Sequence, residues 1–181
     1  MLRILPLLVG LYAAAPPAFA HRVVVDGGRV QMRGELVNGA CAVAPESQDL
    51  RIEMGQYRTN TFAGVGSFST VTVPFTLKLV DCRTDISRLV GVTFQGLSPA
   101  EDPQVFLAAT QVSGVPAGSG LGLALFDNKQ QMIIPNASPV NYFPVPTGEM
   151  ALHFSARYRV ISLPLTPGAI TSDVWFTLIY P

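Results

Sequence analysis

Charged side chains are scarce in this sequence: they make up 13% of its 181 residues, about half the usual share of a globular domain. The 12 Lys and Arg residues balance the 12 Asp and Glu residues, so the formal net charge is zero. Because this composition forms no basic face and no acidic tail, we expect no binding to nucleic acid or to an anionic membrane surface. A surface this poor in charge is typical of a protein that buries much of it in an assembly.

The sequence also lacks the residue patterns of common catalytic and metal sites. His21 and His153 are the only histidines, and neither is spaced to join a cysteine in a metal site. Residues 118–122 are glycine-rich but have no helix pattern after them, so they do not form a phosphate-binding loop. Asp81 and Asp85 are interpreted as residues of a loop or strand end rather than a catalytic carboxylate pair. We therefore expect no enzymatic activity, no metal and no cofactor.

Apolar runs long enough to span a membrane are missing as well, since a spanning helix needs roughly 20 apolar residues. The longest run, residues 4–15, follows the positive Arg3 and precedes a small-x-small motif, Ala18-Phe19-Ala20. This pattern predicts a secretory signal peptide over residues 1–20. A retained N-terminal anchor is the alternative. After cleavage the mature chain, residues 21–181, has 11 Lys and Arg residues against 12 Asp and Glu residues, a net charge of about −1.

What the sequence has in abundance is alternation of apolar and polar residues, with almost no helical periodicity. The clearest runs predict half-buried strands over residues 71–79, 152–160 and 30–36, and weaker runs predict strands over residues 50–57, 89–94, 105–108 and 121–126. Pro74 within the first run indicates a sheet edge or a bulge. Turn-forming clusters separate the runs, including residues 116–120, 144–148 and 164–168. This spacing predicts one domain, an all-β antiparallel sandwich.

Two cysteines, Cys41 and Cys82, remain in the mature chain. An even number of cysteines in an exported protein predicts one disulfide. The bridge closes a loop of about 40 residues, for which the chain-entropy model gives about 4 kcal/mol of stabilisation.

The two ends of the chain carry unusual strand patterns. At the C-terminus an apolar face runs to the penultimate residue, through Ile170, Val174, Phe176, Leu178 and Tyr180, with Ser172 among them. Such a face needs pairing within a sheet, although chain ends normally fray. At the N-terminus, residues 21–28 hold three consecutive valines and then a glycine pair. An ordinary first strand, a frayed tail and a detachable strand that pairs with another molecule all fit this pattern.

Taken together, these segments resemble the subunits of chaperone–usher fimbriae, the type 1 pilin family in particular. The resemblance is densest in residues 25–43, which hold a glycine pair, a Val-x-apolar-x-Gly strand and Ala-Cys-x-Val. It continues in order through residues 52–59, 75–82, 121–127, 154–158 and 167–180, and so covers the mature chain. Pro181, Trp175 and the four later methionines depart from the usual shaft subunit, so both a major shaft subunit and a minor adaptor or terminator subunit stay open.

The resemblance implies an incomplete immunoglobulin-like sandwich that is completed by a donor strand from a neighbouring subunit, a form of β-augmentation. It implies a donor-strand extension over residues 21–36 and a pilin domain over residues 37–181. The donor residues implied are Val23, Val25, Gly27, Gly28, Val30 and Met32, with the phase of alternation around the glycine pair left open. The acceptor and chaperone-binding strand implied contains Val174, Phe176, Leu178 and Tyr180, and the Tyr180 hydroxyl is expected at the wet mouth of the groove.

The partners implied are identical or related pilin subunits, a periplasmic chaperone and an outer-membrane usher, and the location implied is a cell-surface fimbria reached through the periplasm. A tip adhesin is disfavoured because the chain has no room for an additional lectin domain. An autonomous secreted binding domain is the remaining alternative from a different class.

Overall fold

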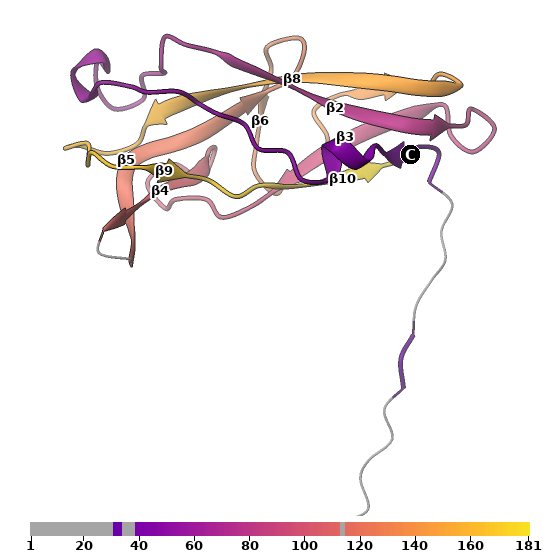
Figure 1. Ribbon diagram of the computed structural model, residues 1–181, viewed down its shortest axis with the longest axis horizontal. Helices are drawn as coiled ribbons and strands as arrows, with labels where there is room; N and C mark the ends of the chain where they lie inside the picture. Colours follow the sequence, from indigo (N-terminus) through magenta and orange to yellow (C-terminus); the bar gives the residue numbers. More distant parts are fainter. Residues whose placement is uncertain (1–30, 34–38, 113–114) are drawn as a thin grey trace, which may run out of the picture. The chain divides into compact units, whose positions relative to one another are not determined.

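The computed structural model describes residues 31–33, 39–112 and 115–181. The chain divides into two units, Met1–Leu36 and Val37–Pro181, and the fold described below is that of the second unit (Figure 1). In chain order its elements are β1 (Ala42–Val43), α1 (Pro45–Gln48), the short 3-10 helix η1 (Thr59–Thr61), β2 (Val73–Cys82), β3 (Leu89–Gln95), β4 (Phe106–Val112), β5 (Val115–Phe126), β6 (Met132–Ile133), β7 (Tyr142–Pro144), β8 (Gly148–Val160), β9 (Ile170–Thr171) and β10 (Trp175–Ile179).

The strands form two sheets in which every described pair is antiparallel. The larger sheet has the order β1-β2-β8-β5-β4-β9, and β6 also pairs with β5. The smaller sheet has the order β10-β3-β7. The predicted all-β antiparallel class is therefore confirmed.

The centre of the larger sheet is built by β2 and β8, which contain the two clearest alternating runs of the sequence. Phe75 pairs with Phe154 and Leu77 with Leu152. In β8 the alternating apolar residues of the predicted run, at positions 152, 154, 156, 158 and 160, are all buried. Pro74 lies in a part of β2 that pairs only with β8, because β1 reaches β2 at Leu79 and Val80. The missing N–H of Pro74 therefore interrupts no ladder on its other side.

The strands β3, β4 and β5 also occur where the sequence predicts them, but β4 and β5 are longer than expected. The turn-forming residues 116–120 predicted a loop, and the structure instead includes them in β5. They pair across the hairpin with β4, with a bulge between Ala108 and Ala109. Antiparallel pairing over this length outweighs the low strand propensity of Gly, Pro and Ser.

Side chains from both sheets meet in one core. Val90, Val92 and Phe94 of β3 are buried against the inward rows of β2, β5 and β8. Aromatic rings connect the layers: Phe94 lies 5.1 Å from Phe154 and 6.4 Å from Phe176, measured between ring centroids. The Phe94–Phe154 pair is edge-to-face, and aromatic pairs at such distances add to the free energy of area burial.

The C-terminal segment differs from its prediction as one long strand. Its first part, β9, pairs with β4 in the larger sheet, and its second part, β10, pairs with β3 in the smaller sheet. Residues 172–174 carry the chain from one sheet to the other and belong to neither ladder. Continuous alternation in the sequence thus persists across a change of sheet.

Within the described residues, no helix has the length and apolar character needed to cross a membrane.

Candidate strand-accepting groove

A groove with a volume of about 1380 Å³ opens along the sandwich between two extended segments. Residues 49–57, here called the N-terminal lip, form one side, and residues 165–176, here called the C-terminal lip, form the other. Both can be followed in Figure 1, the first after α1 and the second through β9 into β10. The floor is apolar and is formed by core residues Phe75, Leu77, Phe94, Leu121, Leu123, Leu125, Ala156 and Tyr158.

The N-terminal lip has no strand partner among the described residues, although the sequence predicts a strand over residues 50–57. That prediction is wrong for this state because extended residues need a neighbouring ladder to form a strand. The apolar side chains Leu50 and Ile52 are 38% and 37% exposed. Met54 and Tyr57 are half-buried and pack against the core. The lip therefore presents apolar side chains that nothing in the described structure fully covers.

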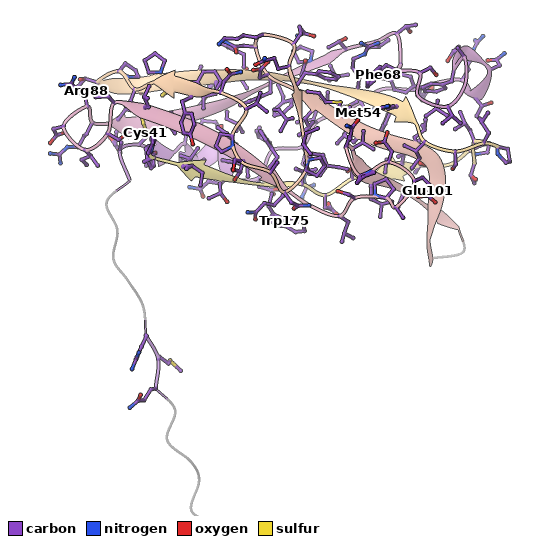
Figure 2. All side chains as sticks on the ribbon, turned by 180° about the vertical axis from the view of Figure 1, so that it is seen from behind. Cys41, Met54, Phe68, Arg88, Glu101 and Trp175 are labelled. Atoms are coloured by element: carbon purple, nitrogen blue, oxygen red, sulfur yellow. A yellow bond between two sulfur atoms is a disulfide. The ribbon has the colours of Figure 1, made fainter. Side chains whose placement is uncertain are left out.

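The C-terminal lip alternates as the sequence predicts. Val174 and Phe176 are half-buried, pack against the core and line the groove. Between them Trp175 is 65% exposed, and Figure 2 shows its side chain pointing outward. One edge of β10 pairs with β3, and β10 is the terminal strand of its sheet, so its groove-facing edge has no described partner. An unpaired edge of this kind is a template for another strand.

Two polar groups in the groove lack hydrogen-bond partners among the described residues. They are the hydroxyl of Tyr57 on the N-terminal lip and that of Ser172 on the C-terminal lip, and both atoms are buried. Leaving a buried polar group unpaired costs about 1–3 kcal/mol. Sequence reasoning missed Tyr57 and gave Ser172 no role, because only the folded arrangement brings the two hydroxyls into one groove.

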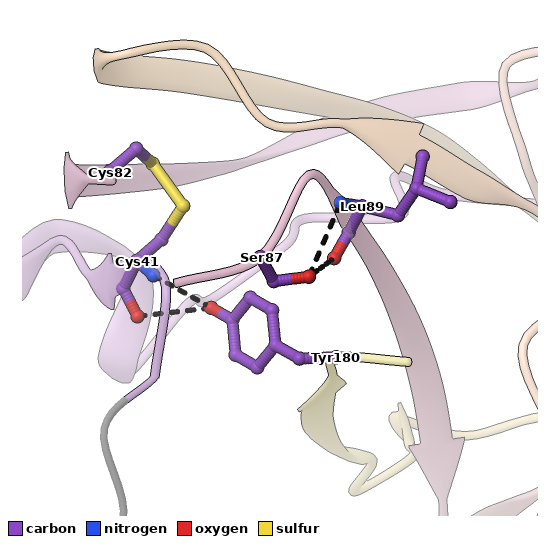
Figure 3. Close-up of a disulfide and its surroundings, with 5 residues drawn as sticks. All are labelled: Cys41, Cys82, Ser87, Leu89 and Tyr180. Carbon is purple, nitrogen blue, oxygen red and sulfur yellow. Dashed lines mark hydrogen bonds between the residues drawn. A yellow bond between two sulfur atoms is a disulfide. The ribbon is translucent and has the colours of Figure 1, made fainter. Parts of the chain in front are cut away.

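At the end of the sandwich near Cys41, the segment before the N-terminal lip and the segment after the C-terminal lip are bonded to each other (Figure 3). Cys41 and Cys82 form the predicted disulfide. The backbone N–H of Cys41 donates to the Tyr180 hydroxyl at 3.0 Å, and that hydroxyl donates to the Cys41 carbonyl at 3.0 Å. Burial raises the pKa of Tyr180, and the hydrogen bond with Cys41 opposes that rise. The expectation of a wet hydroxyl at the groove mouth is therefore wrong: the backbone of Cys41 binds it.

The other predicted site residues are distributed as follows. Of the expected acceptor residues, Val174 and Phe176 line the groove, whereas Leu178 packs against the core and Tyr180 lies at Cys41. Of the expected donor residues, Val23, Val25, Gly27, Gly28 and Val30 lie outside the described residues. Met32 is described, and its side chain is 92% exposed.

The sandwich and its groove define a class of protein before any sequence comparison. The fold is similar to that of the P pilus rod subunit PapA, with a TM-score of 0.66 over 79% of this chain and 100% of that chain, at 20% identity. This likeness identifies the immunoglobulin-like fold of pilins.

Sequence comparison then identifies the family. The model of the family described as fimbrial protein matches residues 30–181. The chain is 58% identical to the fimbrin-like protein FimI of Salmonella typhi over 96% of each chain. It is 30% identical to the type-1 fimbrial protein A chain of the same organism, over 96% of this chain and 93% of that one. The chain therefore belongs to the fimbrial protein family, whose members are structural subunits of fimbriae.

Proposed function

We propose that this chain is a subunit of a chaperone–usher fimbria and that its groove accepts the N-terminal strand of a neighbouring subunit. In this proposal residues 1–20 are a signal peptide, residues 21–36 are the donor extension and residues 37–181 are the acceptor domain. A periplasmic chaperone fills the groove first, and the donor strand replaces it at the outer-membrane usher. The role is structural rather than catalytic.

The observation that carries this proposal is the unfinished groove. One additional strand would cover the apolar floor and pair with the free β10 edge. The same strand would give the extended N-terminal lip a neighbour. The backbone of such a strand offers hydrogen bonds to the β10 edge and to the two buried hydroxyls of Tyr57 and Ser172.

The expected strength of the contact follows from the same features. Burying three or four medium apolar side chains of the donor contributes roughly 5–10 kcal/mol before the entropy cost of ordering the strand. Each ladder hydrogen bond adds about 1 kcal/mol. A strand held in this way dissociates very slowly, as a fibre requires.

The test is thermal unfolding of a shortened chain that begins at Glu35 and so lacks the proposed donor. A synthetic peptide of residues 21–34 is expected to raise its melting temperature, because the peptide finishes the sandwich. The matched control is the same peptide with Val30→Asp, which is expected to have little effect because a carboxylate enters the apolar groove. A shortened chain that is equally stable with and without the peptide would mean that the sandwich is already closed.

The chaperone step has a test of its own. Removal of Leu178 to Pro181 is expected to abolish co-purification of a periplasmic chaperone, because the C-terminal strand then loses the end of its pairing with β3 and its tie to Cys41. An unchanged yield of the complex would contradict a role for this strand in chaperone capture.

A minor rank within the fibre is a second candidate, and one observation favours it. The chain is far more similar to the fimbrin-like FimI of Salmonella typhi than to the type-1 fimbrial A chain of the same organism. The measurement is the copy number per fibre by quantitative mass spectrometry of purified fimbriae. One or a few copies per fibre would support a minor subunit, and a copy number in proportion to fibre length would support the shaft.

A further inference from the structure

The lips of the groove have an outer row of side chains as well as an inner apolar row. On the C-terminal lip the outer row, Thr171, Asp173 and Trp175, is exposed, and the residues between them are half-buried. On the N-terminal lip Asp49, Arg51 and Glu53 alternate with Leu50, Ile52 and Met54. A strand in the groove must therefore meet two environments, apolar inside and polar outside.

The outer row carries an excess of negative charge. Of the four charged residues that line the groove, three are acidic and one is basic, which gives a net charge of −2. The base, Arg51, lies 3.8 Å from Asp49 across an ion pair. Glu53 and Asp173 form no ion pair with any residue in the described part of the chain. The groove thus has one uncompensated carboxylate on each lip.

Trp175 stands two residues from Asp173 on the same outer face. On one side Trp175 pairs with Gln95 of β3. On its other side lies the edge of β10 that has no described partner strand. An indole 65% exposed at the rim of a groove offers its ring to whatever strand lies along that edge. Glu53, Asp173 and Trp175 are called the outer rim below.

The chain's own N-terminal segment has the opposite charge. Residues 21–34 contain three arginines, at positions 22, 29 and 33, against one acid, Asp26, so their net charge is +2 with histidine neutral. In the run Arg29-Val30-Gln31-Met32-Arg33 the apolar residues alternate with the arginines. If Val30 and Met32 face the groove, both arginines face outward.

We propose that the outer rim selects its occupant by charge, so that Asp173 and Glu53 attract the outward arginines of the N-terminal segment of a second copy of this chain. This inference rests on the proposed function of the groove. The last strand of an immunoglobulin-like sandwich runs antiparallel to its neighbour. Pairing Val30 with Phe176 in that direction brings Met32 to Val174.

The same register determines the outer contacts. It brings Arg33 opposite Asp173 and Gln31 opposite Trp175, so that the indole lies diagonally next to both Arg29 and Arg33. Diagonal neighbours on one face of a sheet are within reach of long and aromatic side chains. A guanidinium over the indole adds a cation–π contact. A register shifted by two residues toward the C-terminus would pair Val30 with Leu178 instead. Because Leu178 does not line the groove, the register with Val30 at Phe176 is favoured.

The experiment uses the mature full chain, residues 21–181, refolded with its disulfide formed, and measures the rate at which it assembles into polymers. Neutralising the rim with Glu53→Gln and Asp173→Asn is expected to slow assembly about fivefold. A change of this size lies within the range that the loss of two exposed charge pairs produces. The matched control neutralises two exposed acids that do not line the groove, Glu101→Gln and Glu149→Gln, and leaves the rate unchanged.

Charge reversal tests the pairing directly. Glu53→Arg with Asp173→Arg is expected to slow assembly further, and adding Arg29→Glu with Arg33→Glu in the same chain is expected to restore it. At an ionic strength of about 1 M, where the Debye length is about 3 Å, the differences should largely vanish. Because Trp175 is the single tryptophan of the chain, its fluorescence is expected to shift to shorter wavelength on assembly as the strand covers the indole.

A further variant tests the groove separately from its outer rim. Phe176→Asp places a charge in the inner row and is expected to block assembly. If it blocks assembly while the rim variants assemble at the wild-type rate, or if reversal on both sides restores nothing, the outer-rim inference is wrong and the groove proposal stands. If Phe176→Asp assembles like the wild type, the groove proposal itself fails, and the inference with it.

Discussion

The N- and C-terminal segments of the folded unit are joined at one place and run apart at another. Near Cys41 the Tyr180 hydroxyl joins them by hydrogen bonding with the Cys41 backbone, and β1 and the disulfide attach the N-terminal segment to β2. Along the groove the same two segments run apart, with half-exposed apolar side chains and an unpaired edge between them. A sandwich that lacks one strand is thus held in shape from one end.

The joined end explains how the domain can leave a groove open without collapsing. Exposed apolar surface favours closure of the two lips onto each other. The bonds at Cys41 hold the two segments together at one end, and the aromatic residues of the floor pack in the core between the sheets. The joined end and the open groove are expected to respond to different substitutions.

The largest expected effect is at the joined end. Replacing both cysteines, Cys41→Ala and Cys82→Ala, is expected to lower the free energy of unfolding by about 4 kcal/mol, because the cross-link constrains a long loop of the unfolded chain. Urea unfolding with the donor peptide at a fixed saturating concentration measures this change. A loss below about 1 kcal/mol would contradict the assignment of the disulfide as the main support of this end.

The next effect belongs to the open groove. Phe176→Ala is expected to cost about 1–2 kcal/mol in the empty domain and about 3 kcal/mol with the strand bound, because the half-buried ring becomes fully buried. Its control is Val90→Ala on β3, a residue that is already fully buried. That variant should lose the same amount in both states. Equal losses for Phe176→Ala in the two states would mean that no strand covers it.

A smaller effect is expected from the hydroxyl that joins the ends. Tyr180→Phe removes both hydrogen bonds to Cys41 and is expected to cost about 1–2 kcal/mol. Hydrogen exchange of the Cys41 amide should become faster in the same variant. Tyr142→Phe, which removes an exposed hydroxyl on β7, is the control and should change neither quantity. An unchanged exchange rate in Tyr180→Phe would show that the bond does not protect this amide.

The smallest expected effect is a dependence on alkaline pH. Burial raises the pKa of Tyr180. Burial is also the main cause that raises the pKa of Tyr158, and the neighbouring Tyr57 raises it further. Because the folded state holds these protons more tightly than the unfolded state, stability is fully present below about pH 10 and falls as the pH rises through the folded values. The double variant Tyr158→Phe and Tyr180→Phe should show a shallower fall in urea unfolding across this range. An equally steep fall would assign the loss to other groups.

The sequence predicted the closed parts of the fold well, because alternation there reports burial directly. The rows of β2 and β8 lie on the faces expected from their spacing, and the two cysteines form the expected bridge. Where residues 116–120 join β5, pairing with β4 overrides local turn propensity, which single-sequence reasoning cannot weigh.

The groove was harder to predict, because its defining property is a missing neighbour. The alternation at residues 50–57 indicates an edge suited to a sheet, but it does not say whether the partner lies in the same chain. Likewise the apolar face of residues 170–180 is continuous in sequence, and only the structure divides it into a part that lines the groove and a part that ends at Cys41. The sequence alone does not show that Glu53 and Asp173 line the same groove, because only the folded structure places the two lips on opposite sides of it.

The bridge at Cys41 also determines how a subunit transmits tension along a fibre. In the proposed assembly a pull enters through the strand bound at the C-terminal lip and leaves through the extension that precedes Cys41. The Tyr180 hydroxyl connects the end of that lip's strand to the exit point, and the disulfide passes the remaining load to β2 at the centre of the larger sheet. The N-terminal lip lies inside the covalent loop between Cys41 and Cys82, so in the proposed assembly the disulfide carries the load past this lip.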